Sequence, residues 1–110
     1  MNLIYYHNPR CSKSRQGLQL LGETPVVIRE YLKDPLDIDE LKALFKSLSL
    51  KPIEVIRSKE AKALGLSNMT DDEWIKAISD HPILLERPII SNGSKALIGR
   101  PPELISDFIK

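Results

Sequence analysis

The chain begins with two short apolar runs separated by a helical stretch. Residues 2–6 and 24–31 are apolar, β-branched or aromatic, and each run has the length of a strand. Between them, residues 12–21 combine polar residues with a leucine-rich end, and Gly22 follows as a helix stop. We therefore expect strand, helix, strand, and a helical connection of this kind typically joins two parallel strands.

The middle of the chain carries signals of helix starts. Asp37 and Thr70 are each followed three residues later by a glutamate, the capping-box pattern, and apolar residues then recur at helical spacing. Residues 52–64 are typical of a pair of shorter helices. His81, directly before a proline, is expected to end the last helix. The sequence thus predicts a helical insert over about residues 37–85.

Strand signals return near the end of the chain. Residues 88–91 and 95–98 flank an Asn-Gly turn, which predicts a β-hairpin. A last helix is expected from Pro101 or the proline after it. Its predicted buried face consists of Leu104, Ile105, Phe108 and Ile109. The order β-α-β, helices, β-β-α indicates an α/β thioredoxin-like fold with a small mixed sheet, formed as one domain by residues 1–110.

The composition of the chain excludes several classes of function. The chain has 110 residues, and its 16 basic and 15 acidic side chains nearly cancel, so no field favours nucleic acid or an anionic membrane. No apolar run approaches the roughly 20 residues of a membrane span, and the N-terminus lacks the pattern of a signal peptide, so we expect a cytoplasmic protein. The single cysteine can form neither an internal disulfide nor a cysteine-rich zinc site, and we expect no metal and no bound cofactor.

That cysteine, Cys11, lies where a predicted strand ends and a predicted helix begins. Unpaired amides and the helix dipole lower the pKa of a thiol at such a position. Three nearby cations are expected to act in the same direction: Arg10, Lys13 and Arg15. The same amides, with the hydroxyls of Ser12 and Ser14, are suited to hold a tetrahedral anion. His7 either stabilises the thiolate when protonated or is only a hydrogen-bonded turn residue.

The local pattern excludes two families of thiol enzymes. A thioredoxin or glutaredoxin site requires Cys-x-x-Cys, but residue 14 is serine. Low-molecular-weight tyrosine phosphatases carry Cys-x5-Arg, but residue 17 is glycine. If the protein is a reductase, its electrons must therefore pass through an external thiol, for which glutathione is the obvious donor.

Three segments carry a resemblance to a known family: Tyr6-His-Asn-Pro-Arg-Cys-Ser-Lys-Ser-Arg15, Glu86-Arg-Pro-Ile-Ile90 and Ile98-Gly-Arg-Pro-Pro-Glu103. Together they resemble the glutaredoxin-dependent arsenate reductases (ArsC-like), especially the short reductase-like members of that family. The resemblance implies that Cys11 attacks arsenate, that glutathione displaces the product and that glutaredoxin completes the reduction to arsenite. The partners it implies are thus arsenate or a similar oxyanion, glutathione and glutaredoxin.

The resemblance also implies roles for single residues. His7 would favour the Cys11 thiolate, and Ser14 and Arg15 would lie beside the anion. Three distant arginines would hold the oxyanion: Arg57, placed by the pattern Arg-x-Lys-Glu, Arg87 before Pro88, and Arg100 before Pro101. A guanidinium suits this task because its planar fork of donors binds oxyanions bidentately. In thioredoxin folds the proline at the position of Pro88 is usually cis, so we expect a cis peptide there.

Other functions remain open at this point. Ser12-Lys13-Ser14 replaces the Gly-Thr-Ser that typically follows the nucleophile in the reductases, so the anion site can differ in size or affinity. The same site can serve another oxyanion or a glutathione mixed disulfide. A third alternative is a non-enzymatic regulator, since thioredoxin-fold relatives bind RNA polymerase. Those relatives use Cys-x-x-Cys as a redox switch, which Ser14 removes here.

Overall fold

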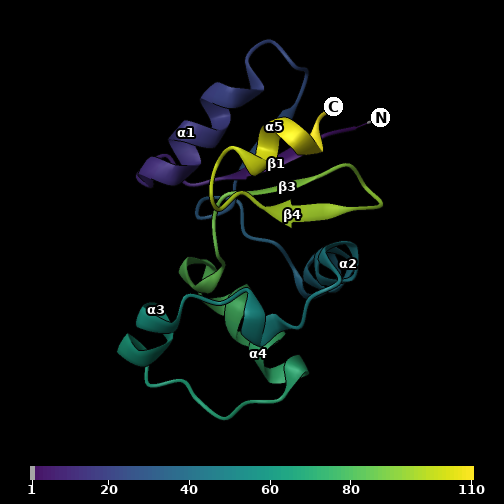
Figure 1. Cartoon of the computed structure of the whole chain (residues 1–110). Helices are drawn as coiled ribbons and strands as arrows, with labels where there is room; N and C mark the ends of the chain where they lie inside the picture. Colours follow the sequence, from purple (N-terminus) through teal and green to yellow (C-terminus); the bar gives the residue numbers. More distant parts are fainter. Residues whose placement is uncertain (1) are drawn as a thin grey trace.

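A four-stranded mixed sheet forms the centre of the structure, a computed structural model that describes residues 2–110 (Figure 1). Its strands are β1 (Ile4–His7), β2 (Val27–Glu30), β3 (Ile89–Ser91) and β4 (Ala96–Ile98), in the order β2-β1-β3-β4. β1 pairs in parallel with β2 and antiparallel with β3, and β3 pairs antiparallel with β4. The mixed sheet and the parallel first pair confirm the predicted fold class.

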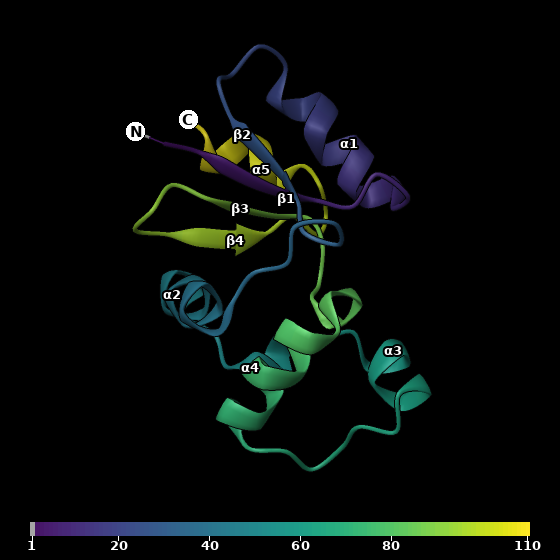
Figure 2. The ribbon, with the colours of Figure 1, turned by 180° about the vertical axis from the view of Figure 1, so that it is seen from behind.

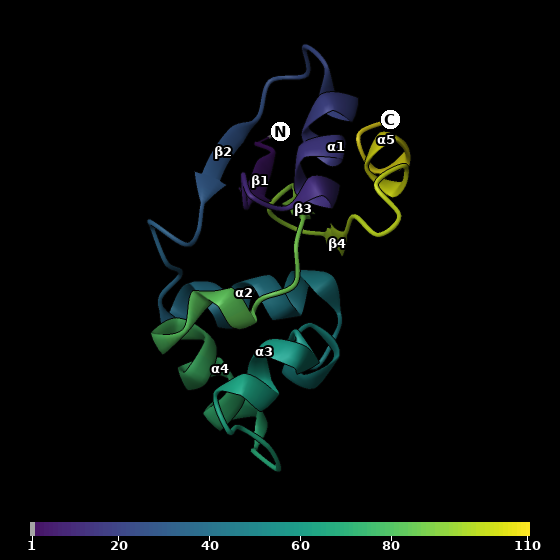
Figure 3. The same ribbon diagram turned by 90° about the vertical axis from the view of Figure 1, so that its left-hand side faces the viewer.

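Two helices cover one face of the sheet. They are α1 (Ser12–Leu21) and α5 (Leu104–Phe108), which lie side by side in Figure 3. Successive strand residues point to opposite faces. Tyr5 and Ile90 therefore join Leu21 and Ile105 in a small core on this face.

The opposite face packs against a helical segment, residues 38–84, which lies below the sheet in Figure 2. Its elements are α2 (Ile38–Leu48), a 3-10 turn η1 (Pro52–Glu54), α3 (Ser58–Ala63), α4 (Asp71–Asp80) and a 3-10 turn η2 (Pro82–Leu84). Both predicted capping boxes are present, at Asp37 and at Thr70, and His81 is the C-cap of α4 as expected. Tyr6 and Ile89 enter the larger core that this segment shares with the sheet.

The ends of some elements differ from the sequence-based expectation. β2 begins at Val27 and not at residue 24, and Val27 itself is 61% exposed because β2 is an edge strand. The last helix begins at Leu104, because residues 101–103 form a turn in which the Leu104 N–H donates to the Pro101 carbonyl at 3.1 Å. Of the predicted buried face, Ile105 is fully buried and Phe108 and Ile109 are partly buried against the same core, whereas Leu104 is 39% exposed.

Three loops meet at the end of the sheet where β1 stops and α1 begins. They are the β1–α1 loop, the loop before β3 and the loop after β4. The last two are tied together, since the Gly99 N–H donates to the Pro88 carbonyl at 2.8 Å. The Arg87-Pro88 peptide is cis, as predicted, and so is the Arg100-Pro101 peptide. None of the helices within residues 2–110 has the length and apolar character needed to cross a membrane.

Candidate active site

The Cys11 thiol lies at the N-terminus of α1, where Cys11 is the N-cap residue. Its backbone is extended, with φ −95° and ψ 123°, and its N–H donates to the Asn8 carbonyl at 3.0 Å. The residue is partly buried. The first amides of a helix have no carbonyl partner within it, so this position favours a negative charge.

The pKa of the Cys11 thiol lies below its ordinary value. Burial acts to raise this pKa, but hydrogen bonds from the backbone of Ser14, the side chain of Arg87 and the backbone of Lys13 outweigh it. The positive charge of Arg87 lowers the pKa further. Because the thiolate is the nucleophilic form of cysteine, the site favours reaction at this sulfur.

Two of the predicted arginines reach the thiol from distant loops. Arg100 Nη2 lies 3.9 Å from the Cys11 sulfur, and Arg100 Nε donates to the Arg87 carbonyl at 2.9 Å. Nε and Nη1 of Arg87 are buried and have no hydrogen-bond partner among residues 2–110. Buried donors without acceptors cost free energy, which an anion would recover by completing their hydrogen bonds. Arg87 therefore offers open donors next to the nucleophile.

The cationic side chains adjacent to Cys11 in sequence do not contact the thiol. The side chains of Arg10 and Lys13 are exposed, and Arg15 donates from Nη1 to the Pro9 carbonyl at 2.9 Å. The expectation that these three charges lower the thiol pKa is therefore corrected in favour of Arg87. The physical reason is direction, because Arg10, Lys13 and Arg15 are exposed to solvent while Arg87 reaches the thiol from the loop before β3.

Ser14 and His7 form a buried pair beneath the thiol. His7 Nδ1 and Ser14 Oγ are 2.7 Å apart, Ser14 Oγ accepts from the Asn8 N–H at 3.0 Å, and the Ser14 carbonyl accepts from the Tyr5 hydroxyl at 2.6 Å. Ser14 is fully buried, so its hydroxyl serves this network, whereas the sequence suggested that it would face an anion. Burial, above all, lowers the pKa of His7, with Arg15 acting in the same direction and Glu30 against it. The hydrogen bond to Ser14 fits the alternative in which His7 is a hydrogen-bonded residue, and the lowered pKa disfavours the protonated form that the other alternative requires.

Arg57 joins this region through a carboxylate. Its Nη1 donates to Glu86 Oε1 at 2.8 Å and its Nε to Glu60 Oε2 at 3.2 Å. Glu86 Oε1 also accepts from the Arg87 N–H at 3.2 Å and lies 3.3 Å from Arg100 Nε. The three distant arginines are thus brought together. Arg57 is held by Glu86 and Glu60, whereas Arg100 has Nε beside Glu86 and Nη2 toward the Cys11 sulfur.

Two residues of this cluster were not identified from the sequence. Glu86 lies in the quoted Glu-Arg-Pro motif, and an acid next to an arginine expected to bind an anion is a signal that it can pair with that cluster. Tyr31 is completely buried and its hydroxyl donates to the Leu85 carbonyl at 3.4 Å. Burial raises the pKa of Tyr31 to about 12, and the charges of Arg87 and Cys11 also act on it, which places this ring beside the site. Nothing in its local sequence indicates that position.

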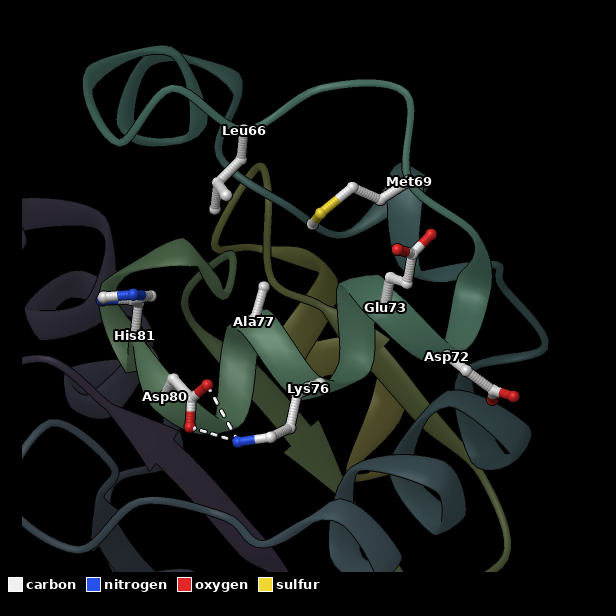
Figure 4. A pocket seen from close by; sticks show the side chains of 8 residues that line it. All are labelled: Leu66, Met69, Asp72, Glu73, Lys76, Ala77, Asp80 and His81. Carbon is white, nitrogen blue, oxygen red and sulfur yellow. Dashed lines mark hydrogen bonds and ion pairs between the residues drawn. The ribbon is translucent and has the colours of Figure 1, made fainter.

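A separate pocket of about 440 Å³ lies on α4 and the preceding loop, shown in Figure 4. It is lined by Leu66, Met69, Asp72, Glu73, Lys76, Ala77, Asp80 and His81. Lys76 Nζ pairs with Asp80 Oδ1 at 2.8 Å, and no lining residue belongs to the Cys11 region. Within the described residues, no group of three or more His, Cys, Asp or Glu side chains is placed to hold a metal ion.

Comparison with known proteins gives matches along nearly the whole chain. The model of a family described as the ArsC family matches residues 6–108. A Haemophilus influenzae protein named arsenate reductase is 41% identical over 116 residues, which cover 99% of this chain and 100% of that protein. A Neisseria meningitidis serogroup A protein of the same name is 46% identical over 107 residues, covering 91% and 92%. A solved structure described as a putative arsenate reductase from Yersinia pestis is similar with a TM-score of 0.89, at 38% identity, covering 96% and 99%.

Proposed function

We propose that this chain, which belongs to the ArsC family, is an oxidoreductase that reduces arsenate to arsenite with Cys11 as its nucleophile. One observation carries the proposal. A thiol whose pKa is lowered lies beside a buried guanidinium, Arg87, that has two donors without partners. A tetrahedral oxyanion supplies the acceptors that these donors lack, and its central atom then lies within reach of the thiolate.

The first step forms a covalent adduct. The Cys11 thiolate attacks the arsenic of arsenate, a sulfur–arsenic bond forms, and one arsenic–oxygen bond breaks. The leaving oxygen takes up protons and departs as water, and arsenic stays pentavalent. Arg87 and Arg100 stabilise the negative charge on the remaining oxygens, while the amides at the start of α1 stabilise the thiolate before attack.

The second step moves electrons. The thiolate of glutathione attacks the sulfur of Cys11, so that a disulfide forms between the two sulfurs and the sulfur–arsenic bond breaks. Arsenic keeps the electron pair and leaves as trivalent arsenite. Because Cys11 is the single cysteine of the chain, an external thiol must then reduce the mixed disulfide, and we assign this task to glutaredoxin. Such a cycle requires a reducing compartment, which supports the cytoplasm as its location.

Arsenite release tests this function. Purified protein, arsenate, glutathione and glutaredoxin are incubated together, and arsenite is quantified against reactions that omit each component. We expect no release without glutathione and at most one arsenite per protein molecule without glutaredoxin. Cys11→Ser should abolish release while its circular dichroism spectrum stays native. Release no faster than in the reaction without protein, from a folded sample with a titratable thiol, would refute arsenate reduction. Release that continues without glutaredoxin would refute only its role as reductant.

A further inference from the structure

Glu86 connects two of the arginines that were expected to hold an oxyanion. Its Oε1 accepts from Arg57 Nη1 at 2.8 Å and lies 3.3 Å from Arg100 Nε. Arg100 in turn is the arginine whose Nη2 lies 3.9 Å from the Cys11 sulfur. One carboxylate oxygen therefore links the helical segment, through Arg57, to the guanidinium at the nucleophile.

The arginines of the cluster differ in whether their charges are neutralised. Arg57 has two carboxylate partners, Glu86 and Glu60, and Arg100 shares Glu86. Arg87 meets Glu86 only through its backbone N–H, and its Nε and Nη1 have no hydrogen-bond partner among the described residues. In the free protein, Glu86 thus occupies the place at Arg57 and Arg100 that an acceptor oxygen of a bound anion would take.

We propose that Glu86 acts as an internal anion that competes with the oxyanion for Arg57 and Arg100 and so lowers the ground-state affinity of the site. The inference rests on the proposed function for the identity of that oxyanion. An incoming oxyanion must displace the carboxylate or bind beside it, and either event weakens binding of the free anion because like charges repel and existing charge-assisted hydrogen bonds must be exchanged.

The surroundings of Glu86 allow this exchange. A pocket of about 190 Å³ is lined by Glu86 and Arg57 together with Ile56, Ser58, Lys59 and Glu60. A water molecule fills about 30 Å³ of the liquid, so this space, which is not lined by Cys11, Arg87 or Arg100, has room for several water molecules beside the carboxylate. The Glu86 side chain is 23% exposed, so the carboxylate can exchange its arginine partners for solvent without unfolding of the core.

Competition of this kind lowers the ground-state affinity of the site for tetrahedral oxyanions in general. Phosphate and arsenate present the same arrangement of oxygens to the arginines, so an unopposed cluster would hold both in the ground state. An internal carboxylate lowers the affinity for both, while the bond that Cys11 forms to arsenic is available to arsenate alone. Turnover is favoured when an enzyme binds the free anion weakly and stabilises the transition state more strongly.

The test measures protection of Cys11 from alkylation by iodoacetamide in the presence of increasing inorganic phosphate, and separately of arsenate. Wild type is compared with Glu86→Gln, which keeps an oxygen acceptor for Arg57 and Arg100 but removes the charge. Glu60→Gln is the matched control, because Glu60 contacts Arg57 and not Arg100. We expect Glu86→Gln to lower the half-protecting phosphate concentration by about tenfold, and Glu60→Gln by less than about threefold.

Each outcome bears on the proposal. A loss of charge that tightens anion binding supports it, whereas a merely structural role predicts weaker binding in Glu86→Gln. Unchanged or weaker protection in that variant overturns the proposal, as does an equal gain in Glu60→Gln. Absence of protection in wild type and both variants overturns it together with the oxyanion site. Protection without arsenite release refutes the proposed reaction but not the role of Glu86.

A second measurement uses the wild-type protein and does not depend on the folding of a variant. The carboxyl carbon of Glu86 is followed by carbon-13 NMR during a phosphate titration. If phosphate displaces the carboxylate from its arginines, the resonance shifts with the same midpoint as the protection of Cys11. A Glu86 resonance that stays constant while Cys11 becomes protected overturns the proposal.

Discussion

The reactivity of Cys11 depends on arginines that are distant in sequence, and this dependence can be measured. The perturbation is the replacement of one guanidinium at a time by the neutral side chain of glutamine, at Arg87, at Arg100 and at Arg10. The first two lie at the thiol, while Arg10 is adjacent in sequence and exposed. We expect the pKa of the Cys11 thiol to rise in Arg87→Gln and Arg100→Gln, with the larger effect at Arg87.

The size of the effect at Arg100 follows from its geometry. Nη2 lies 3.9 Å from the sulfur, a separation at which two unit charges interact by about 1 kcal/mol in water and about 4 kcal/mol at an effective dielectric constant of about 20. The Arg100 side chain is 36% exposed, so the value in water applies. A loss of about 1 kcal/mol lowers the ratio of thiolate to thiol by about fivefold.

The effect at Arg87 is expected to be greater because Nε and Nη1 of this guanidinium are shielded from water. A loss of about 1.4 to 2.8 kcal/mol, between the two Coulomb values, corresponds to a ratio of thiolate to thiol that is about 10-fold to 100-fold lower. For Arg10, which is exposed, the change should stay below about twofold. The order of the three variants, more than any single value, tests the structural argument.

The assay is the rate of alkylation by iodoacetamide as a function of pH, and the single cysteine makes the signal unambiguous. The midpoint of the profile gives the thiol pKa, which separates the thiolate fraction from the higher nucleophilicity of a more basic thiolate. An Arg10→Gln midpoint that rises as far as that of Arg87→Gln would refute the reasoning. So would an Arg87→Gln profile that coincides with wild type.

Two further predictions concern the packing beneath the site. Gly17→Ala should lower the free energy of unfolding by about 1–3 kcal/mol in urea denaturation, because a Cβ atom at this position would overlap Tyr5 Oη and Ile105 Cδ1. Gln16→Ala, at an exposed position of the same helix, serves as the neutral control. Equal stability of the two variants would contradict this packing. Burial lowers the pKa of His7, so the unfolded state binds a proton first as the pH falls, and the free energy of unfolding should decrease from about pH 7 to about pH 5. His7→Gln should lose this decrease and the exposed His81→Gln should keep it, and a decrease that persists in His7→Gln would count against the assignment.

The fold could be predicted from the sequence because its strongest signals are local. Asp37 and Thr70 form the expected capping boxes, and the Asn-Gly turn joins β3 to β4 as expected. The ends of elements were less accurate. Residues 24–26 have strand composition, yet the Val27 N–H donates to the Leu3 carbonyl where the parallel pairing with β1 starts. Tertiary pairing, which decides that boundary, leaves no signal in the local pattern.

The position of the thiol could also be predicted from local spacing, whereas Arg87 and Arg100 were expected at the site only through the family resemblance. Cys11 lies at the helix N-terminus as its place between strand and helix indicated. Proximity in sequence suggested Arg10 and Arg15 as its cations, whereas Arg87 and Arg100 reach it across 76 and 89 positions of the chain. Which cations reach the thiol depends on the directions of side chains near the start of α1 and on the paths of the loops that carry Arg87 and Arg100. The local spacing of residues predicts neither.

The same chemistry that suits arginine to an oxyanion also makes it pair with carboxylates when no oxyanion is bound. The affinity of this site for an anion therefore equals the free energy of the arginine–anion contacts minus that of the arginine–carboxylate contacts that the anion replaces. It is not a sum of three arginine contacts. Arg87, whose open donors face no such competitor, contributes to binding directly, while Arg57 and Arg100 contribute only what remains after Glu86 is displaced. Removal of charge at Arg87 and at Glu86 should consequently change anion affinity in opposite directions, which a site built only from additive attractive contacts would not do.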